Sequence, residues 1–422
     1  MDSFLQLKLL LAVLVFSLII IAETYFKGPF NDLSIPLILD MQKDPSFFSH
    51  AIFTFATGCG SYFGYSLMLV IMTTTLQKVK HFLFAIPLLM ANFLSFFLKN
   101  FYHDNRPSWD IEEIEMKDFE KEWGNPSAHA MQNQVLFTLA TYLLVCDNKD
   151  CLTDIAPLKP VKKSSILKIM ISFLILSVFL FTIFMSRLYK GAHTLNQVFF
   201  GLLIGEFCVL ISIFFARELL IQFYKSLRKP VVSYKKSFIE KGLPLILLGL
   251  LLTLAHVILY LYLLPLDSTK LTIDIIEIMK KFKHNVESDY AINSCFIFSG
   301  TWGCFIGSIV GTIIDIYYFK NPIDAWEAPV PWWKRILRVP VLYVILHLHF
   351  VVLIVARKFI FNPFLLFSIV YGSFFILFVL LFGFTLKIVQ VCHLHPTNFE
   401  EIRKQLQENE TEFDPLKENK IE

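Results

Sequence analysis

Long apolar runs follow one another along most of the chain, with short polar segments between them. A helix needs about 20 mostly apolar residues to cross the hydrocarbon core of a bilayer. Runs of roughly that length occur near residues 4–23, 52–75, 81–98, 129–146, 165–185, 194–216, 242–264, 291–317, 339–356 and 363–391. The pattern predicts an all-α fold, namely a polytopic membrane bundle of about ten transmembrane helices.

The composition agrees with a membrane protein. Hydrophobic residues make up 55% of the chain and charged residues 17%, against about 45–50% and about 25% in soluble domains. These values exclude a disordered chain, a collagen and a disulfide-stapled secreted domain. The net charge of +3 is too small to indicate nucleic acid, so the expected partner is the lipid bilayer. The seven cysteines show no CxxC pair and no metal-ligand spacing, and we interpret them as packing thiols.

The basic residues between the spans predict the orientation. Lys and Arg gather between the second and third runs, between the fourth and fifth, and above all in segment 217–241, which holds seven of them. With ten spans these three loops lie on one side, which the positive-inside rule makes cytosolic together with both termini.

The polar residues of the opposite side lie in three short groups. Lys99 and Arg106 are seven residues apart, about two helical turns. Ser127–His129 opens the fourth span, where a helix start offers free backbone N–H groups to an anion. Arg187 ends the fifth span, and His193 opens the sixth. Three cations and two histidines therefore meet at one membrane face, and such a cluster is suited to binding a phosphate.

The order K-x6-RP, PSxH and SR-x5-H resembles the three-part signature of the type 2 phosphatidic acid phosphatase superfamily. That family includes lipid phosphate phosphatases, sphingosine-1-phosphate phosphatases, dolichyl diphosphatases and glucose-6-phosphatase. The matching stretches are Lys99–Pro107, Pro126–His129 and Ser186–His193. The resemblance implies a six-helix phosphatase core. We therefore divide the chain into an N-terminal span and luminal loop, the phosphatase core, a basic loop with four further spans, and a cytosolic polar tail, at 1–50, 51–216, 217–395 and 396–422.

Carried over by position, the resemblance implies a role for each residue. His193 attacks phosphorus and forms a phosphohistidine, while His129 protonates the leaving oxygen and then activates water. The groups that hold the phosphate oxygens are the side chains of Lys99, Arg106, Arg187 and Ser127 and the backbone N–H of Ala128. We expect no cofactor and no metal, because the basic side chains supply the positive charge.

Two positions depart from the family pattern. Ala128 stands where many members have Gly, which is a change between small residues. Gln197 stands four residues after His193, where the family usually has an Asp that orients the nucleophilic imidazole. Glucose-6-phosphatases and dolichyl diphosphatases also carry Gln there, and the amide oxygen of Gln197 can accept the same hydrogen bond.

The leading interpretation is a phosphatase acting on a lipid phosphate, such as sphingosine-1-phosphate or phosphatidic acid, in the endoplasmic reticulum with its active site facing the lumen. A glucose-6-phosphatase-like or isoprenoid diphosphatase activity is the alternative, favoured by Trp109 in RPSW and by Gln197, whereas Tyr189 and Gly191 favour the lipid enzymes. Two other classes remain open: a transporter, and an inactive scaffold that binds a lipid phosphate. A transporter would place ionisable residues near the middle of its spans, whereas here they lie at the span ends.

Two further segments each allow two interpretations. Segment 108–124 contains seven acidic residues and two lysines with aromatic residues between them. We expect a solvated loop with aromatic anchors at the membrane interface; the alternative is a lid whose charge discriminates among anionic substrates. The small-residue run at 299–311 favours close helix packing over a cleft for a lipid tail.

Overall fold

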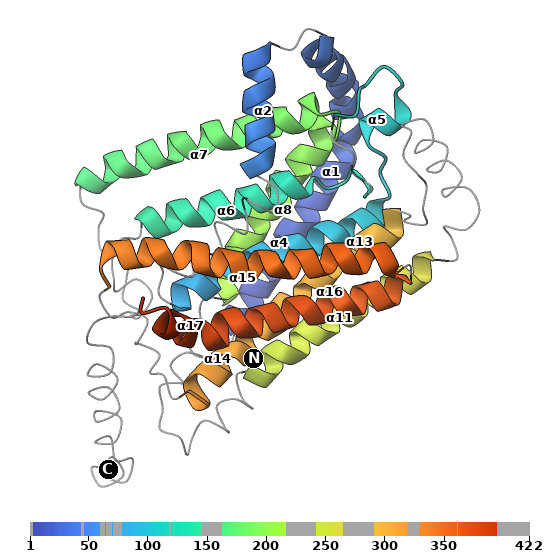
Figure 1. Cartoon of the computed structure of the whole chain (residues 1–422). Coiled ribbons are helices and arrows are strands. Elements are labelled where there is room, and N and C mark those ends of the chain that lie inside the picture. The colour runs from blue at the N-terminus through green and yellow to red at the C-terminus, as the bar shows by residue number, and fades with distance from the viewer. Residues whose placement is uncertain are drawn as a thin grey trace.

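The computed structural model describes residues 3–43, 46–59, 64, 70, 78–117, 120, 122–145, 163–216, 242–264, 291–319, 330–360 and 362–394. These residues are almost entirely helical and include no strand, which confirms the all-α prediction (Figure 1). The basic loop expected at 217–241 and the tail at 396–422 lie outside the described residues.

Six helices form a first lobe, which contains the three motif segments. They pack mainly through contacts of α6 with α4, α7 and α8, of α8 with α1, and of α7 with α2. A short helix, α5 (Pro107–Asp110), follows α4. The six are α1 (Ser3–Lys43), α2 (Phe47–Cys59), α4 (Lys78–Tyr102), α6 (Ala128–Val145), α7 (Lys163–Tyr189) and α8 (Leu195–Ile211), the last continuing into the π-helical turn Ser212–Ala216.

The C-terminal helices form a second lobe, which packs on α4 through α13 and the 3-10 turn Gly300–Trp302. Apolar side chains from both lobes, including Phe93 and Phe305, share one core cluster. The helices of this lobe are α11 (Leu243–Leu263), α13 (Ala291–Ser299), α14 (Gly303–Tyr317), α15 (Trp332–Phe359), α16 (Pro363–Val379) and α17 (Thr385–Val391), with the π-helical turn Leu380–Phe384 before α17.

Seven of the described helices are long and apolar enough to cross a membrane. Many side chains of α7 and α11 are exposed and apolar, for example Phe173 and Leu251, as expected for helices whose solvent is lipid. The chain is therefore an integral membrane protein. The seven spans are Gln6–Lys43, Ala85–Asp110, Met170–Tyr189, Leu195–Phe215, Leu243–Leu263, Asn293–Ile316 and Pro363–Val391.

The other predicted spans have mixed outcomes. Residues 129–146 and 339–356 correspond to α6 and α15, which are not among these seven spans. The span predicted at 52–75 begins in α2, and most of its residues after Cys59 lie outside the described part of the chain. The luminal loop expected after residue 23 is wrong up to Lys43, because α1 continues as one helix of 41 residues with two prolines inside it.

Close packing between α8 and α6 holds two of the motif segments together. A Cβ at Gly201 would lie 2.6 Å from the Ser127 carbonyl oxygen, and one at Gly205 would lie 2.5 Å from the carbonyl oxygen of Met131. Any side chain at these positions would push the helices apart. The two glycines therefore allow the helix that follows His193 to lie directly against the helix that carries His129.

The small-residue run at 299–311 packs closely against α16, as predicted. A Cβ at Gly303 would collide with the carbonyl oxygen of Tyr371, and one at Gly307 with that of Phe375. At Gly311 a Cβ would lie 2.8 Å from the carbonyl oxygen of Val379. Three glycines at intervals of four residues thus form the face on which α14 and α16 meet.

We predict that Gly307→Val destabilises the protein by about 1–3 kcal/mol, the usual scale of overpacking in a filled interface. Gly372→Val is the matched control, because a Cβ on this glycine of α16 would meet no atom within 4 Å. Thermal unfolding of the purified protein in detergent measures both. Equal transition temperatures for the two variants would contradict the packing role of Gly307.

Candidate active site

His193 lies in a tight turn between α7 and α8. Gly191 in this turn has a φ of 64°, a left-handed conformation that glycine adopts without steric cost. A Cβ there would also lie 2.6 Å from the Glu115 carbonyl oxygen. After the turn, Thr194 and Gln197 form a capping box that begins α8. The turn and the cap together fix the direction in which the His193 ring leaves the backbone.

The hydrogen bonds of His193 determine its tautomer. Its Nδ1 lies 2.8 Å from the carbonyl oxygen of Gly124 and 3.3 Å from Oε1 of Gln197. Both oxygens are acceptors, so Nδ1 carries the proton and Nε2 keeps its lone pair. Burial lowers the pKa of His193 well below its ordinary value, and the charges of Arg106 and Arg187 lower it further. His193 is therefore neutral at physiological pH, with an unprotonated Nε2.

Arg106 is held rigidly beside that nitrogen. Its Nε donates to the carbonyl oxygen of Glu122 at 2.7 Å, and its Nη1 donates to that of Ala192 at 2.9 Å. The same Nη1 lies 3.3 Å from Nε2 of His193. Arg106 is fully buried. Its guanidinium is thus a fixed positive charge whose position depends on two loops and not on solvent.

Arg187 is in the last turn of α7 and is fully buried. Its Nη2 donates to the carboxylate of Glu120. Within the described part of the chain, its Nε and Nη1 have no hydrogen-bond partner. Buried guanidinium donors are rarely left unpaired, so these two nitrogens are suited to binding an anion that carries several acceptor oxygens.

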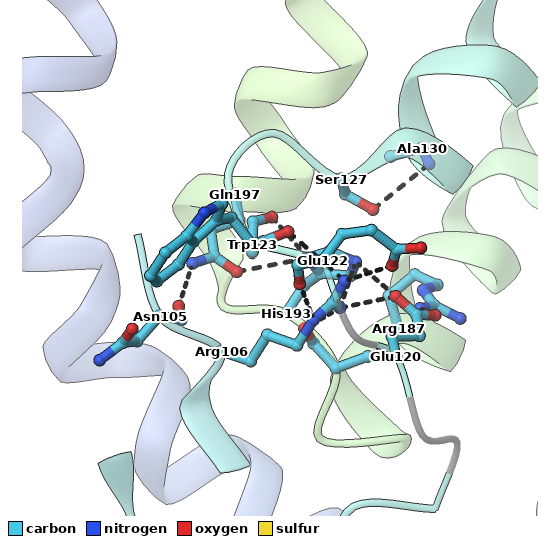
Figure 2. Close-up of polar contacts among 12 residues, drawn as sticks. Asn105, Arg106, Glu120, Glu122, Trp123, Ser127, Ala130, Arg187, His193 and Gln197 are labelled. Atoms are coloured by element: carbon cyan, nitrogen blue, oxygen red, sulfur yellow. Dashed lines mark hydrogen bonds and ion pairs between the residues drawn. The ribbon is translucent and has the colours of Figure 1, made fainter. Parts of the chain in front are cut away.

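The carboxylate of Glu120 lies between the two arginines (Figure 2). Its Oε2 is 2.6 Å from Nη1 of Arg106 and 3.8 Å from Nε2 of His193. Burial alone would raise the pKa of Glu120, but the charges of Arg106 and Arg187 outweigh it and hold the pKa well below its usual value. Glu120 is therefore ionised, and it lies at the centre of the cation cluster.

The remaining motif residues surround this cluster. Lys99 is buried in the last turn of α4 and interacts electrostatically with Arg106 and Glu120. His129, in the first turn of α6, interacts in the same way with Arg187 and Glu120. The structure thus brings together the three cations and two histidines that the sequence predicted at one face.

Ser127 lies just before α6, and its hydrogen bonds are with Gln197 and Ala130. Its N–H donates to the carbonyl oxygen of Gln197 at 2.9 Å, and its Oγ accepts from the N–H of Ala130 at 3.5 Å. In this structure the hydroxyl is thus directed at the first turn of α6, which begins at Ala128. Ser127 thereby ties the start of α6 to the start of α8.

The side chain of Gln197 contacts Nδ1 of His193, as predicted, but the backbone of Gly124 contacts the same nitrogen. The Gly124 carbonyl is the nearer acceptor, and Gln197 also donates through Nε2 to the carbonyl oxygen of Asn105 at 2.8 Å. Gln197 therefore links His193 to the residue that precedes Arg106. Sequence reasoning missed the contribution of Gly124, since a backbone carbonyl leaves no signature in the side chains.

The interpretation of segment 108–124 as a solvated loop with interface anchors was wrong for its tryptophans. Trp109 and Trp123 are buried, as is Ile114, and the two tryptophan rings contact each other edge to face. The loop is instead part of the site, since Glu120, Glu122 and Gly124 all contact Arg106 or His193. The acid-rich composition of the segment was the one sequence signal that could have indicated its contact with the basic residues of the site.

The site therefore consists of a neutral histidine beside two buried arginines, in a polytopic membrane protein. Residues 78–219, a third of the chain, match the family model of the PAP2 superfamily, which is the family that the motifs resemble. The family implies phosphatase-type activity on phosphate esters. A search of curated proteins and a search of solved structures gave no match.

We predict that Gly124→Ala lowers kcat by about 10- to 100-fold, the scale expected when a residue that orients a reacting group is lost. The added Cβ would lie 2.6 Å from the Gln197 amide atoms and 2.8 Å from the Asn105 carbonyl oxygen, so both acceptors of His193 Nδ1 would shift. Gln197→Leu should cost about tenfold or less, because the Gly124 carbonyl remains. Phosphate release measures both effects.

Gly28→Ala is the matched control for Gly124→Ala, because a Cβ on Gly28 would meet no atom within 4 Å. It should keep wild-type activity. Full activity in Gly124→Ala would show that the Gly124 carbonyl does not fix the tautomer of His193.

Proposed function

We propose that the protein hydrolyses a phosphomonoester, in particular a lipid phosphate such as sphingosine-1-phosphate or phosphatidic acid, at the non-cytosolic face of its membrane. The observation that carries this proposal is the unprotonated Nε2 of His193, which faces Arg106 and the carboxylate that bridges Arg106 and Arg187. A nucleophile and two fixed cations are the parts that metal-independent phosphoryl transfer requires.

In the proposed first step, Nε2 of His193 attacks phosphorus and the bond from phosphorus to the ester oxygen breaks. The leaving oxygen takes a proton from His129, and the arginines stabilise the charge on the non-bridging oxygens. The Gly124 carbonyl and Gln197 stabilise the positive imidazole ring of the phosphohistidine. In the second step water attacks phosphorus, His129 accepts its proton, and His193 is released with inorganic phosphate.

A lipid substrate agrees with the position of the site. Arg187 and His193 lie where α7 ends and α8 begins, and both helices are apolar enough to span the membrane. Phe101 and Phe199, in α4 and α8 near the motif residues, are 61% and 44% exposed. An amphiphilic substrate would place its phosphate in the buried cluster while its tail stays in lipid. A sugar phosphate would gain nothing from these apolar surfaces.

We predict that the purified protein releases phosphate from sphingosine-1-phosphate or phosphatidic acid, and that His193→Ala abolishes turnover. A panel with glucose-6-phosphate and an isoprenoid diphosphate separates the lipid proposal from its alternatives. His393→Asn is the control, because His393 is exposed at the end of α17 and Asn tolerates its positive φ.

Vanadate should inhibit the reaction as a mimic of five-coordinate phosphorus, and chelators should leave the rate unchanged. Loss of activity with EDTA, restored by a divalent ion, would contradict the mechanism. Release from glucose-6-phosphate alone would contradict the lipid substrate.

We also predict the sidedness of the site from the positive-inside rule. Glu113→Asn together with Glu115→Thr creates a glycosylation sequon at two exposed positions of the site loop. This sequon should be modified in a cell, because the loop faces the lumen. A sequon placed within residues 225–236 should stay bare, and the opposite pattern on a gel-shift assay would reverse the proposed orientation.

A further inference from the structure

Glu120 binds the groups to which the proposed function assigns the substrate phosphate. Its two carboxylate oxygens pair with different arginines, Oε2 with Arg106 at 2.6 Å and Oε1 with Arg187. Carboxylate and phosphoryl oxygens are equivalent acceptors for a guanidinium fork. Oε2 also lies 3.8 Å from Nε2 of His193, so the carboxylate stands in front of the nucleophile.

We propose that Glu120 is an internal competitor for the phosphate site, which every anionic substrate must displace before His193 can attack. The inference rests on the proposed function, since it concerns the same arginines and the same histidine. It assigns a role in anion binding to an acidic residue outside the three motifs.

The exposure of these side chains indicates which of them can move. The side chain of Glu120 is 18% exposed, whereas those of Arg106 and Arg187 are 1% and 0% exposed. Arg106 keeps its bonds to the backbone carbonyls of Glu122 and Ala192 when Glu120 leaves. Displacing the carboxylate therefore leaves the Arg106 guanidinium in place.

The charge balance explains why an acid is present without substrate. Two buried guanidinium groups with a buried lysine nearby would be strongly unfavourable without a counter-ion, and Glu120 supplies one. A phosphomonoester brings up to two negative charges and three non-bridging oxygens. Those oxygens can also bind Nε and Nη1 of Arg187, which have no partner among the residues that the structure describes. A phosphomonoester thus brings more charge and more acceptor oxygens to the arginines than the Glu120 carboxylate does, which favours displacement of Glu120.

The test measures the binding of orthovanadate and of inorganic phosphate to the purified full chain by calorimetry. A ligand binds more weakly by the fraction of time that its site is open. If Glu120 fills the site for about 90–99% of the time, Glu120→Gln should tighten both ligands by the same factor of about 10- to 100-fold. KM for the substrate should fall with them.

Two matched variants separate competition from a general effect of charge. Glu122→Gln removes a carboxylate that lies 3.6 Å from Nη2 of Arg106 and forms no ion pair with Arg187 among the described residues, and it should tighten binding by at most about fivefold. Glu113→Gln removes an exposed charge from the same loop and should change nothing. If Glu120→Gln is unstable, Glu120→Asp withdraws the carboxylate by one methylene and should also tighten binding, though by less.

Unchanged or weaker vanadate binding in Glu120→Gln would overturn the inference, because Glu120 would then be a permanent counter-ion. Phosphate release by the wild-type protein would leave the proposed function intact in that case. Tighter vanadate binding in Glu120→Gln, in a protein that releases phosphate from no substrate, would support the competitor role and contradict the proposed function.

Discussion

The structure depends on keeping two guanidinium groups out of water at one end of a helical bundle. Arg106 and Arg187 have no solvent exposure, and each buried ion costs several kcal/mol unless it is paired and hydrogen-bonded. Carbonyl groups of residues 122, 123 and 192 accept hydrogen bonds from Arg106, and the Glu120 carboxylate pairs with both arginines. The same low-dielectric surroundings keep His193 neutral, so the stability of the cluster and its chemistry have one physical origin.

The groups that bind the two arginines lie on loops. These loops are held by close contact between α6 and α8 and by a second cluster of polar side chains. Gly201 and Gly205 bring α8 against α6. In the second cluster, Asn125 donates to the carboxylates of Glu23 and Asp104 at 2.7 and 2.8 Å. Lys27 of α1 pairs with Asp104 at 2.6 Å. The long N-terminal helix is therefore part of the support for the motif loop, although it carries no motif itself.

The C-terminal lobe lies outside the matched family segment, yet it contacts the helix that carries Lys99. Asn100, the next residue, lies 3.3 Å from His256 of α11 through its side-chain nitrogen, and Cys295 of α13 interacts electrostatically with Lys99 itself. Aromatic rings including Phe93, Phe296 and Trp302 fill the space between the lobes. The lobe thus covers the side of α4 that would otherwise leave a lysine facing lipid.

The sequence by itself determined the helical class, most of the spans and the motif residues, since apolar runs and fixed side-chain spacing are local properties. It also indicated the close packing of 299–311 from small residues alone. Only the tertiary structure decided that α1 continues to Lys43, that Trp123 is buried and that the Gly124 carbonyl holds His193. It also placed Glu120, out of seven acids in one loop, between two arginines that are distant in sequence. Backbone acceptors and the choice among equivalent acids depend on distances across the fold, and no local pattern encodes those distances.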